Sequence, residues 1–251
     1  MATASGPSMG YLAKVPALAL IMFAESIAFY PPNTSPPKSD DRAKFGRPDL
    51  ITRIPSFVPK IVMALYYSLH LVEIAALLAH VYPSHPLSAL ILARLFPGPF
   101  PTAGSPAQLA LSPAFLLGFL MLVAGAALRK VCYATLGRFF TYQLALFKGH
   151  KLVTWGPYAV VRHPSYSGFI IAAAGLLIVQ FGPGSYLYES GALEHRWVAT
   201  AAVGWALWML SVVAVAVGRV STEDKVLKKE FGKEWEAWAK KTPYRLVPYL
   251  Y

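Results

Sequence analysis

The sequence predicts an all-α membrane protein, a polytopic bundle of about five spanning helices. Of the 251 residues, 56% are hydrophobic and only 14% are charged, whereas soluble domains carry about 25% charged residues. The apolar residues form runs near the length that crosses a bilayer as a helix, about 20 residues. The basic residues stand in blocks between these runs, as in membrane proteins that use them to set topology. We therefore interpret the net charge of +11 as a topology signal and expect no nucleic-acid partner.

Five runs are the expected spans: 11–30, 61–82, 109–128, 167–181 and 197–217. The fourth run is long enough to span only if its helix begins near Pro164. The first run is interpreted as a retained span, because its only basic residue, Lys14, lies inside the run and no clear cleavage site follows. A shorter apolar piece, 87–96, is expected to be interfacial or re-entrant.

Three ionisable residues and two glycines within the spans carry further expectations. Glu25 is expected at the end of its span, near the membrane–water interface. His70 and Glu73 share one helix face, and we expect them to pair with each other or to face the bundle interior. Gly118 and Gly125 give the third span a small-residue face for close helix packing.

The alternation of loop charge predicts the topology. Basic loops cover 33–60, 129–162 and the tail from 218, whereas the N-terminus, 83–108 and 182–196 hold few Lys or Arg. The positive-inside rule then places the N-terminus outside and the C-terminus in the cytosol. The loop after the third span and the tail therefore share the cytosolic face, where they can form one site.

The tail is expected to contain an amphipathic helix that ends at Pro243. Its apolar residues recur at steps of three to four, and its tryptophans suit a membrane interface. These residues are Val226, Leu227, Phe231, Trp235 and Trp238. We divide the chain into N-terminal transmembrane helices, 1–130, and a catalytic region, 131–251. The single cysteine, Cys132, excludes an internal disulfide and a cysteine-based metal cluster, and we expect no metal.

The stretch 149–168 has the composition of a binding site. It gathers two His, two Tyr, Arg, Lys, Ser and Thr. Gly156-Pro157 predicts a turn, and His163-Pro164 predicts an extended residue followed by the start of a helix. A helix N-terminus offers free backbone N–H groups and a positive dipole, which favour a carboxylate or a similar anion.

Arg219 and Glu223 stand four residues apart, on one face of a helix that continues from the fifth span. They could form an ordinary ion pair at the interface. Alternatively, Arg219 is a cation for an anionic substrate and Glu223 a carboxylate for a cationic ligand, and the neighbouring polar stretch favours this second interpretation.

From about Gln143 onward the chain resembles the isoprenylcysteine carboxyl methyltransferase family. The first signature is carried by residues 149–153, 156–158 and 162–168, which read GHKLV, GPY and RHPSYSG. The second is carried by Arg219, Glu223-Asp224, Phe231-Gly232 and 243–248, which read PYRLVP at the end. Asp224 departs from the family, which often has a second Glu there, and the span count is lower than in animal members.

The resemblance implies S-adenosyl-L-methionine as the methyl donor and, as acceptor, the prenylated C-terminal cysteine of CaaX-processed proteins in the endoplasmic reticulum membrane. Arg219 matches the catalytic residue expected to hold the acceptor carboxylate. The positions matched to donor binding are Gln143, His150, Lys151, Leu152, Val153, Tyr158, His163, Pro164, Ser165, Tyr166 and Glu223.

Elementary chemistry agrees with this implication. The acceptor carboxylate is already ionised at pH 7 and needs no general base. A guanidinium can align it through two parallel hydrogen bonds. The prenyl chain must arrive from membrane lipid, which accounts for a catalyst within the membrane.

Three alternatives remain at the level of sequence. A phospholipid amine N-methyltransferase would need a base, because its acceptor must be neutral to attack. A sterol-reductase-like enzyme shares a similar tail near 243–248 and would use a nicotinamide cofactor. A transport or structural membrane protein would use the loops for topology alone, which the density of polar groups in 149–168 disfavours.

Overall fold

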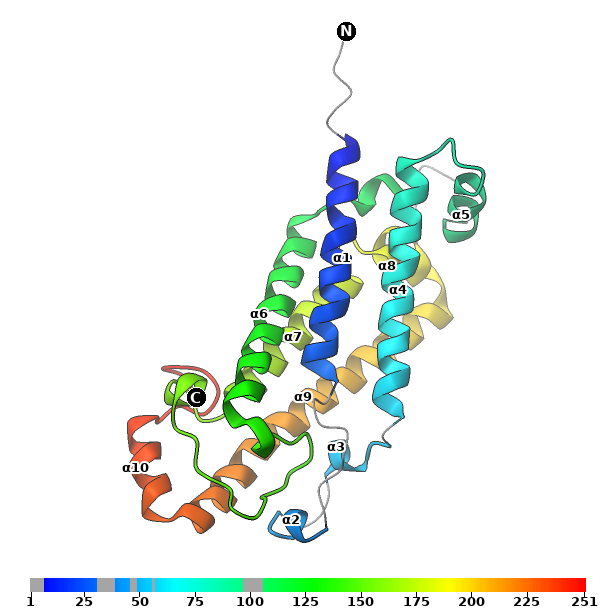
Figure 1. Ribbon diagram of the computed structural model, residues 1–251. Helices are drawn as coiled ribbons and strands as arrows, with labels where there is room; N and C mark the ends of the chain where they lie inside the picture. The colour runs from blue at the N-terminus through cyan, green and yellow to red at the C-terminus, as the bar shows by residue number, and fades with distance from the viewer. Residues whose placement is uncertain (1–6, 31–38, 46–48, 56, 97–105) are drawn as a thin grey trace.

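The structure, a computed structural model, describes residues 7–30, 39–45, 49–55, 57–96 and 106–251, and in these ranges it contains helices and no strand. Five helices are long and apolar enough to cross a membrane (Figure 1). They are α1 (Pro7–Phe29), α4 (Val58–Val81), α6 (Pro113–Leu136), α7 (Pro164–Phe181) and α9 (Arg196–Phe231). The predicted all-α bundle of five spans is therefore confirmed.

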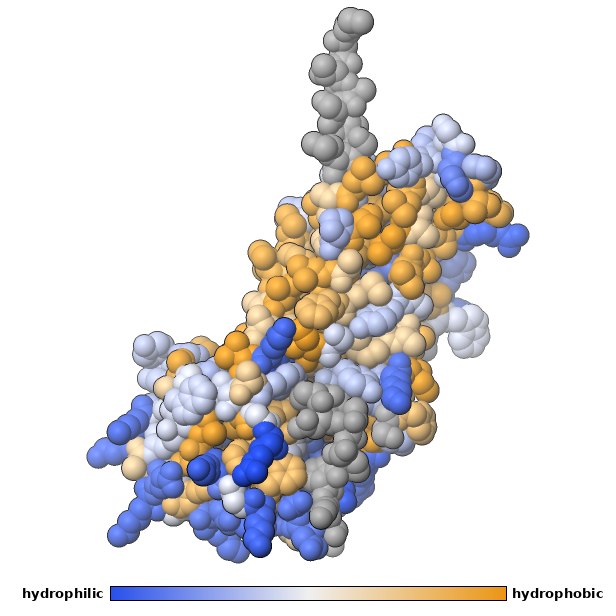
Figure 2. All heavy atoms as spheres, in the orientation of Figure 1, coloured by the Kyte–Doolittle hydropathy of each residue, from blue (hydrophilic) through white to orange (hydrophobic). Residues whose placement is uncertain are grey.

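Shorter helices connect the five long ones. They are α2 (Ser39–Ala43), α3 (Leu50–Arg53), α5 (Ser88–Leu95), α8 (Tyr186–Glu189) and α10 (Lys233–Lys241). Four 3₁₀ turns lie at Pro106–Leu109, Gly137–Phe139, Gly156–Ala159 and Ala192–Glu194. Hydrophobic side chains cover the middle and upper part of the face in Figure 2, whereas hydrophilic ones gather at the lower end, where Figure 1 shows α2 and α10.

Helices α6 and α7 form the most extensive helix pair of the bundle, and α1 packs across α6 and α4. Glycine makes the close approach of α6 and α7 possible. A Cβ on Gly125 would lie 2.5 Å from the carbonyl oxygen of Gly168, and one on Gly175 would lie 2.5 Å from the backbone nitrogen of Leu122. A Cβ on Gly118 would lie 2.9 Å from the carbonyl oxygen of Gly175, so the small-residue face expected on the third span is confirmed.

The fourth span depends on Pro164, as expected. Helix α7 begins at this proline, which occupies the first helical position and has no N–H that would need a partner there. The helix then has 18 residues. The 3₁₀ turn at Gly156–Ala159 starts at a glycine with φ of +62°, which agrees with the predicted turn at Gly156-Pro157.

The fifth span and the tail helix differ from the prediction. Helix α9 continues without interruption past residue 217 to Phe231 and ends where Gly232 adopts φ of +50°. The predicted tail helix is therefore two segments, the end of α9 and α10. Trp238 is buried and donates its indole N–H to the carbonyl oxygen of Tyr158 at 3.1 Å, so its expected contact with the membrane interface is wrong.

The ionisable residues inside the spans pair between helices. Glu25 is fully buried, not interfacial as expected, and its carboxylate lies 2.8 Å from His70 Nε2. Lys14 Nζ lies 2.5 Å from Glu73 Oε1. His70 and Glu73 do face the interior, but each meets a partner on α1, because a buried charge away from water needs an opposite charge or a hydrogen bond.

Two other expectations concern the segment 87–96 and the division of the chain. Helix α5 is short, exposes Leu90 and its N-cap residue Leu87, and lies at one end of the bundle (Figure 1), which favours the interfacial alternative. The expected boundary after residue 130 falls inside α6, which packs along α7. The division into two regions stays a prediction about function.

The α6–α7 contact gives a first prediction. Gly125→Val should destabilise the fold by about 1–3 kcal/mol, because the new Cβ would meet backbone atoms that cannot turn aside. Gly204→Val is the matched control, since no atom lies within 4 Å of the Cβ built there. Thermal unfolding of both variants in detergent should show a loss for Gly125→Val only, and equal stability would contradict the proposed close contact.

Candidate functional site

A cavity lies where α6, α7 and α9 meet the polar loops, at the end of the bundle that carries α10. Its empty volume is about 1100 Å³, part of it open to solvent. Ten of the twelve residues matched from the family signatures line it: Gln143, His150, Leu152, Val153, Tyr158, His163, Ser165, Tyr166, Arg219 and Glu223. Pro164 and Lys151 do not line it; Pro164 begins α7, and the Lys151 side chain is exposed. Hence the structure brings together residues separated by up to 80 positions.

The loop after α6 supplies one wall of the cavity. His150 lies between two aromatic rings, with centroid distances of 4.6 Å to Phe139 and 6.1 Å to Phe231. Burial lowers the pKa of His150, so its ring is neutral at pH 7. Its Nδ1 is buried and has no hydrogen-bond partner in the described residues. A neutral imidazole with an unpartnered nitrogen in a cavity wall is suited to bind a polar group of a ligand.

Gln143 lies in the same loop and connects it to the first basic loop. Its side-chain oxygen is 3.5 Å from Arg42 Nη1. Nearby, the backbone N–H of Leu146 donates to the carbonyl oxygen of Asp41 at 2.8 Å. The segment around α2 is therefore attached to the cavity wall.

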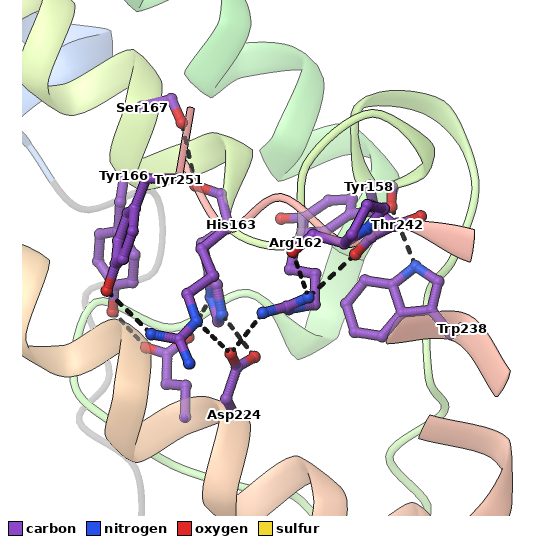
Figure 3. A network of polar contacts seen from close by, with 12 residues as sticks. Tyr158, Arg162, His163, Tyr166, Ser167, Asp224, Trp238, Thr242 and Tyr251 are labelled. Atoms are coloured by element: carbon purple, nitrogen blue, oxygen red, sulfur yellow. Dashed lines mark hydrogen bonds and ion pairs between the residues drawn. The ribbon is translucent and has the colours of Figure 1, made fainter. Parts of the chain in front are cut away.

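A buried ion cluster centred on Asp224 holds the other wall in place (Figure 3). Its carboxylate accepts from His163 Nε2 at 2.9 Å and from Arg162 Nη2 at 3.1 Å, and Arg245 Nε lies 3.3 Å away. Arg162 Nη1 also donates to the carbonyl oxygens of Thr242 and Pro243. Asp224 thus links α9, the start of α7 and the C-terminal tail.

His163 stands between two carboxylates. Its Nδ1 is 3.3 Å from Glu223 Oε2, while its Nε2 faces Asp224. Burial alone would lower the pKa of His163, but hydrogen bonds and charge from both carboxylates outweigh burial and raise it. With both nitrogens engaged, His163 orients Glu223 and is less suited than His150 to touch a ligand directly.

Tyr166 and Tyr158 complete this wall. The hydroxyl of Tyr166 donates to Glu223 Oε1, so one carboxylate oxygen of Glu223 faces Tyr166 and the other faces His163. Burial raises the pKa of Tyr158 well above its usual value, which keeps its hydroxyl neutral. Arg129, from α6, donates to the backbone and the hydroxyl oxygen of Ser165 at 3.0 and 3.2 Å and adds positive charge at the start of α7.

Arg219 does not form the ion pair with Glu223 that its spacing suggested as an alternative. Its guanidinium instead binds Asp49 through two parallel contacts, Nε to Oδ2 at 2.5 Å and Nη2 to Oδ1 at 2.7 Å. Tyr142 and Thr52 accept two further hydrogen bonds from it. Burial would raise the pKa of Asp49, but the hydrogen bonds and the charge of Arg219 hold it below its usual value.

Residues 116–189 match the isoprenylcysteine carboxyl methyltransferase (ICMT) family. Protein-S-isoprenylcysteine O-methyltransferase B of Arabidopsis thaliana is 33% identical over 128 residues, which are 50% of this chain and 55% of that protein. Protein-S-isoprenylcysteine O-methyltransferase of Schizosaccharomyces pombe is 35% identical over 129 residues, 51% of this chain and 46% of that protein. The resemblance to the ICMT family is confirmed.

The ICMT match is partial in extent. The chain spans about half the length of the curated relatives it matches. The family match runs from α6 to α8, so it contains the loop and the start of α7 but ends before Arg219 and Glu223. A mouse Delta(14)-sterol reductase, TM7SF2, is 24% identical over 106 residues, 41% of this chain but only 20% of that protein.

Sequence reasoning missed two groups of the site. Asp49 lies in a charged, proline-rich loop, and its contact with Arg219 joins positions 170 apart, which no local pattern reveals. Arg162 and Arg245 were identified only as basic loop residues and as positions within the two signatures, and their contact with Asp224 was not predicted. The one signal was that Asp224, Arg162 and Arg245 all fall within those signatures.

The ion cluster gives a second prediction. Because the folded-state pKa of His163 is raised above about 6.5, its stabilising charge is fully present below pH 6.5 and is lost as the pH rises through the raised value. The difference in melting temperature between wild type and His163→Gln should therefore be largest near pH 6 and shrink at alkaline pH. Comparing the two proteins at each pH cancels the effect of other titrating groups. A melting-temperature difference that does not change with pH would contradict a raised pKa of His163.

Proposed function

We propose that this protein transfers a methyl group from S-adenosyl-L-methionine to the C-terminal carboxylate of a prenylated cysteine in CaaX-processed proteins. The observation that carries the proposal is the cavity itself. It joins Glu223, the unpartnered nitrogen of His150 and the guanidinium of Arg219 at one end of a spanning bundle. The names of the relatives in the ICMT family support the same activity.

The residues present fit the donor. The cavity is lined mainly by apolar and aromatic side chains with a few polar groups, as small-molecule sites are. His150 offers the orphaned Nδ1 and an aromatic neighbour, Phe139, for the planar base. Glu223 supplies negative charge for a cationic centre, while Arg129 and the start of α7 supply positive charge for a carboxylate. The bound donor would supply an electrophilic methyl carbon on a sulfonium.

The residues present also fit the acceptor. A carboxylate reaching Arg219 could be held through two hydrogen bonds and turned toward Glu223, and orientation of this kind can lower a barrier by about 7–11 kcal/mol. Apolar residues also line the cavity, among them Ile51 of α3, Phe169 of α7 and Ala216 of α9. They suit a prenyl chain that arrives from membrane lipid. We place the protein in the endoplasmic reticulum membrane with the cavity facing the cytosol, because the loops that form the cavity are the basic ones.

The site is less suited to the two rival enzyme classes. An amine acceptor is a cation before it loses its proton, and the guanidinium of Arg219 in the cavity would repel it. The sterol reductase similarity covers a small part of that protein and does not by itself favour a nicotinamide cofactor.

Donor binding gives a third prediction. His150→Ala should weaken the affinity for S-adenosyl-L-methionine by about tenfold or more, because it removes one polar contact of about 1.5 kcal/mol and part of the aromatic wall. Lys148→Ala is the matched control, since this exposed side chain of the same loop does not line the cavity and is not among the positions matched to donor binding. Calorimetry on detergent-purified protein measures both. Equal affinities in the two variants would remove His150 from the donor site.

The acceptor gives a fourth prediction, which also tests the proposed function. With labelled donor, purified protein should methylate a farnesyl-cysteine analogue and should leave phosphatidylethanolamine unmodified. Arg219→Ala should lower single-turnover transfer by about thirty-fold or more, because losing a charge-assisted contact in a dry site costs about 2–5 kcal/mol. Arg219→Lys should recover only part, since an ammonium cannot hold a carboxylate through two parallel bonds.

Donor affinity on the same preparations separates the outcomes. It should survive in both Arg219 variants, because Arg219 is assigned to the acceptor. Methylation of phosphatidylethanolamine alone would overturn the proposed acceptor, and full transfer in Arg219→Ala would overturn the role of the guanidinium.

A further inference from the structure

The guanidinium assigned to the acceptor already holds a carboxylate of the same chain. Arg219 donates four hydrogen bonds of the five that a guanidinium can make. Two of them form the parallel contact to Asp49 that an acceptor carboxylate would need. The Arg219 side chain is only 5% exposed, so water does little to solvate its positive charge, and the charge depends on nearby protein groups. An acceptor carboxylate can form two parallel hydrogen bonds with Arg219 only after Asp49 has released the guanidinium.

Asp49 belongs to a segment that crosses the cavity. We call it the strap and define it by its described parts, 39–45 and 49–53. Phe45 and Ile51 of the strap line the cavity. Other polar contacts of the described strap residues include Lys44 to Glu230, Arg42 to Gln143 and the carbonyl oxygen of Asp41 to the backbone N–H of Leu146. The Asp49 side chain is 25% exposed and can reach water once it is released.

Asp49 has a second, local role that can be separated from the first. It is the N-cap of α3, and its Oδ1 accepts from the backbone N–H of Thr52 at 2.9 Å. Asparagine and serine cap helices about as well as aspartate. A substitution can therefore remove the negative charge and keep the short helix.

We propose that Asp49 is an internal stand-in for the acceptor carboxylate and competes with it for Arg219. The inference rests on the proposed function. Displacement of Asp49 by a carboxylate exchanges one ion pair for another, so the guanidinium stays compensated throughout. A neutral headgroup or an amine has no charge to offer Arg219 in exchange. Asp49 is then a specificity-determining residue, because only an acceptor that carries a negative charge can replace it at the guanidinium of Arg219.

The same competition acts after the reaction. Transfer forms a bond between a carboxylate oxygen and the methyl carbon and breaks the bond between that carbon and sulfur. The electron pair of the broken bond stays on sulfur, the sulfonium becomes a neutral thioether, the carboxylate becomes a neutral ester, and no proton moves. The ester no longer compensates Arg219, whereas Asp49 still does. Return of Asp49 to Arg219 therefore favours release of the product.

The test compares two ligands on protein variants: N-acetyl-S-farnesyl-cysteine, which is an acid, and its methyl ester. In Asp49→Asn the acid should bind about tenfold more tightly than in wild type, because it no longer displaces an ion pair, and the ester should bind about as before. Asp49→Ser should give the same result if either variant folds poorly. Asp41→Asn is the matched control, because it removes a charge from the strap that does not contact Arg219, and both affinities should stay at their wild-type values.

Hydrogen exchange adds a readout independent of affinity. On wild type, the acid should speed amide exchange in 49–53, and the ester should not. Tighter binding of the acid in Asp49→Asn together with this exchange supports the inference. Unchanged or weaker binding of the acid in both Asp49 variants overturns it and makes Asp49 a residue that only orients Arg219. If neither wild type nor the Asp49 variants bind the acid or methylate it, the proposed function fails together with the inference.

Discussion

The carboxylate of Asp224 is the point at which three distant parts of the chain are joined. It lies on α9, accepts from Arg162 and His163 just before α7, and faces Arg245 of the tail. Backbone hydrogen bonds from Arg162 and His163 to the tail, both 2.9 Å, reinforce this junction. Breaking a buried ion pair by removing one partner typically costs about 3–5 kcal/mol, because the remaining charge stays buried. The cavity walls therefore depend on this junction for their relative position.

The junction also accounts for the departure from the family pattern at this position. A shorter acid than Glu is sufficient here because two guanidinium groups and one imidazole converge on it from separate segments. Glu223, the adjacent acid, points the other way and meets Tyr166 and the second nitrogen of His163. Two neighbouring carboxylates thus have different tasks: Asp224 holds the structure together, and Glu223 presents its charge to the cavity.

Much of this arrangement could be predicted from sequence, and the reasons for the rest are physical. Composition and run length predict the spans, and glycine spacing predicts close packing of the third span, although not which helix packs there, because these are local patterns. The crowding of polar residues in 149–168 predicted a binding site there, whereas Gln143, Arg219 and Glu223 outside it came from the family resemblance. Partner choice was not predictable: Glu25 meets His70, and Asp49 meets Arg219, across long separations. The sequence also does not predict what the apolar face of an amphipathic helix contacts. The indole of Trp238 packs against Tyr158 inside the protein.

Helix α9 is one continuous rod of 36 residues, about 54 Å long at 1.5 Å per residue, whereas the hydrocarbon core of a bilayer is about 30 Å thick. Only 17% of its apolar window is buried within the protein, so lipid is its main neighbour over much of that length. Arg219, Glu223 and Asp224 stand on its far part. A rigid rod of this kind tilts when the thickness of the surrounding bilayer changes, and its ends then move further than its middle. A change in bilayer thickness that tilts α9 would therefore move these three residues relative to the start of α7.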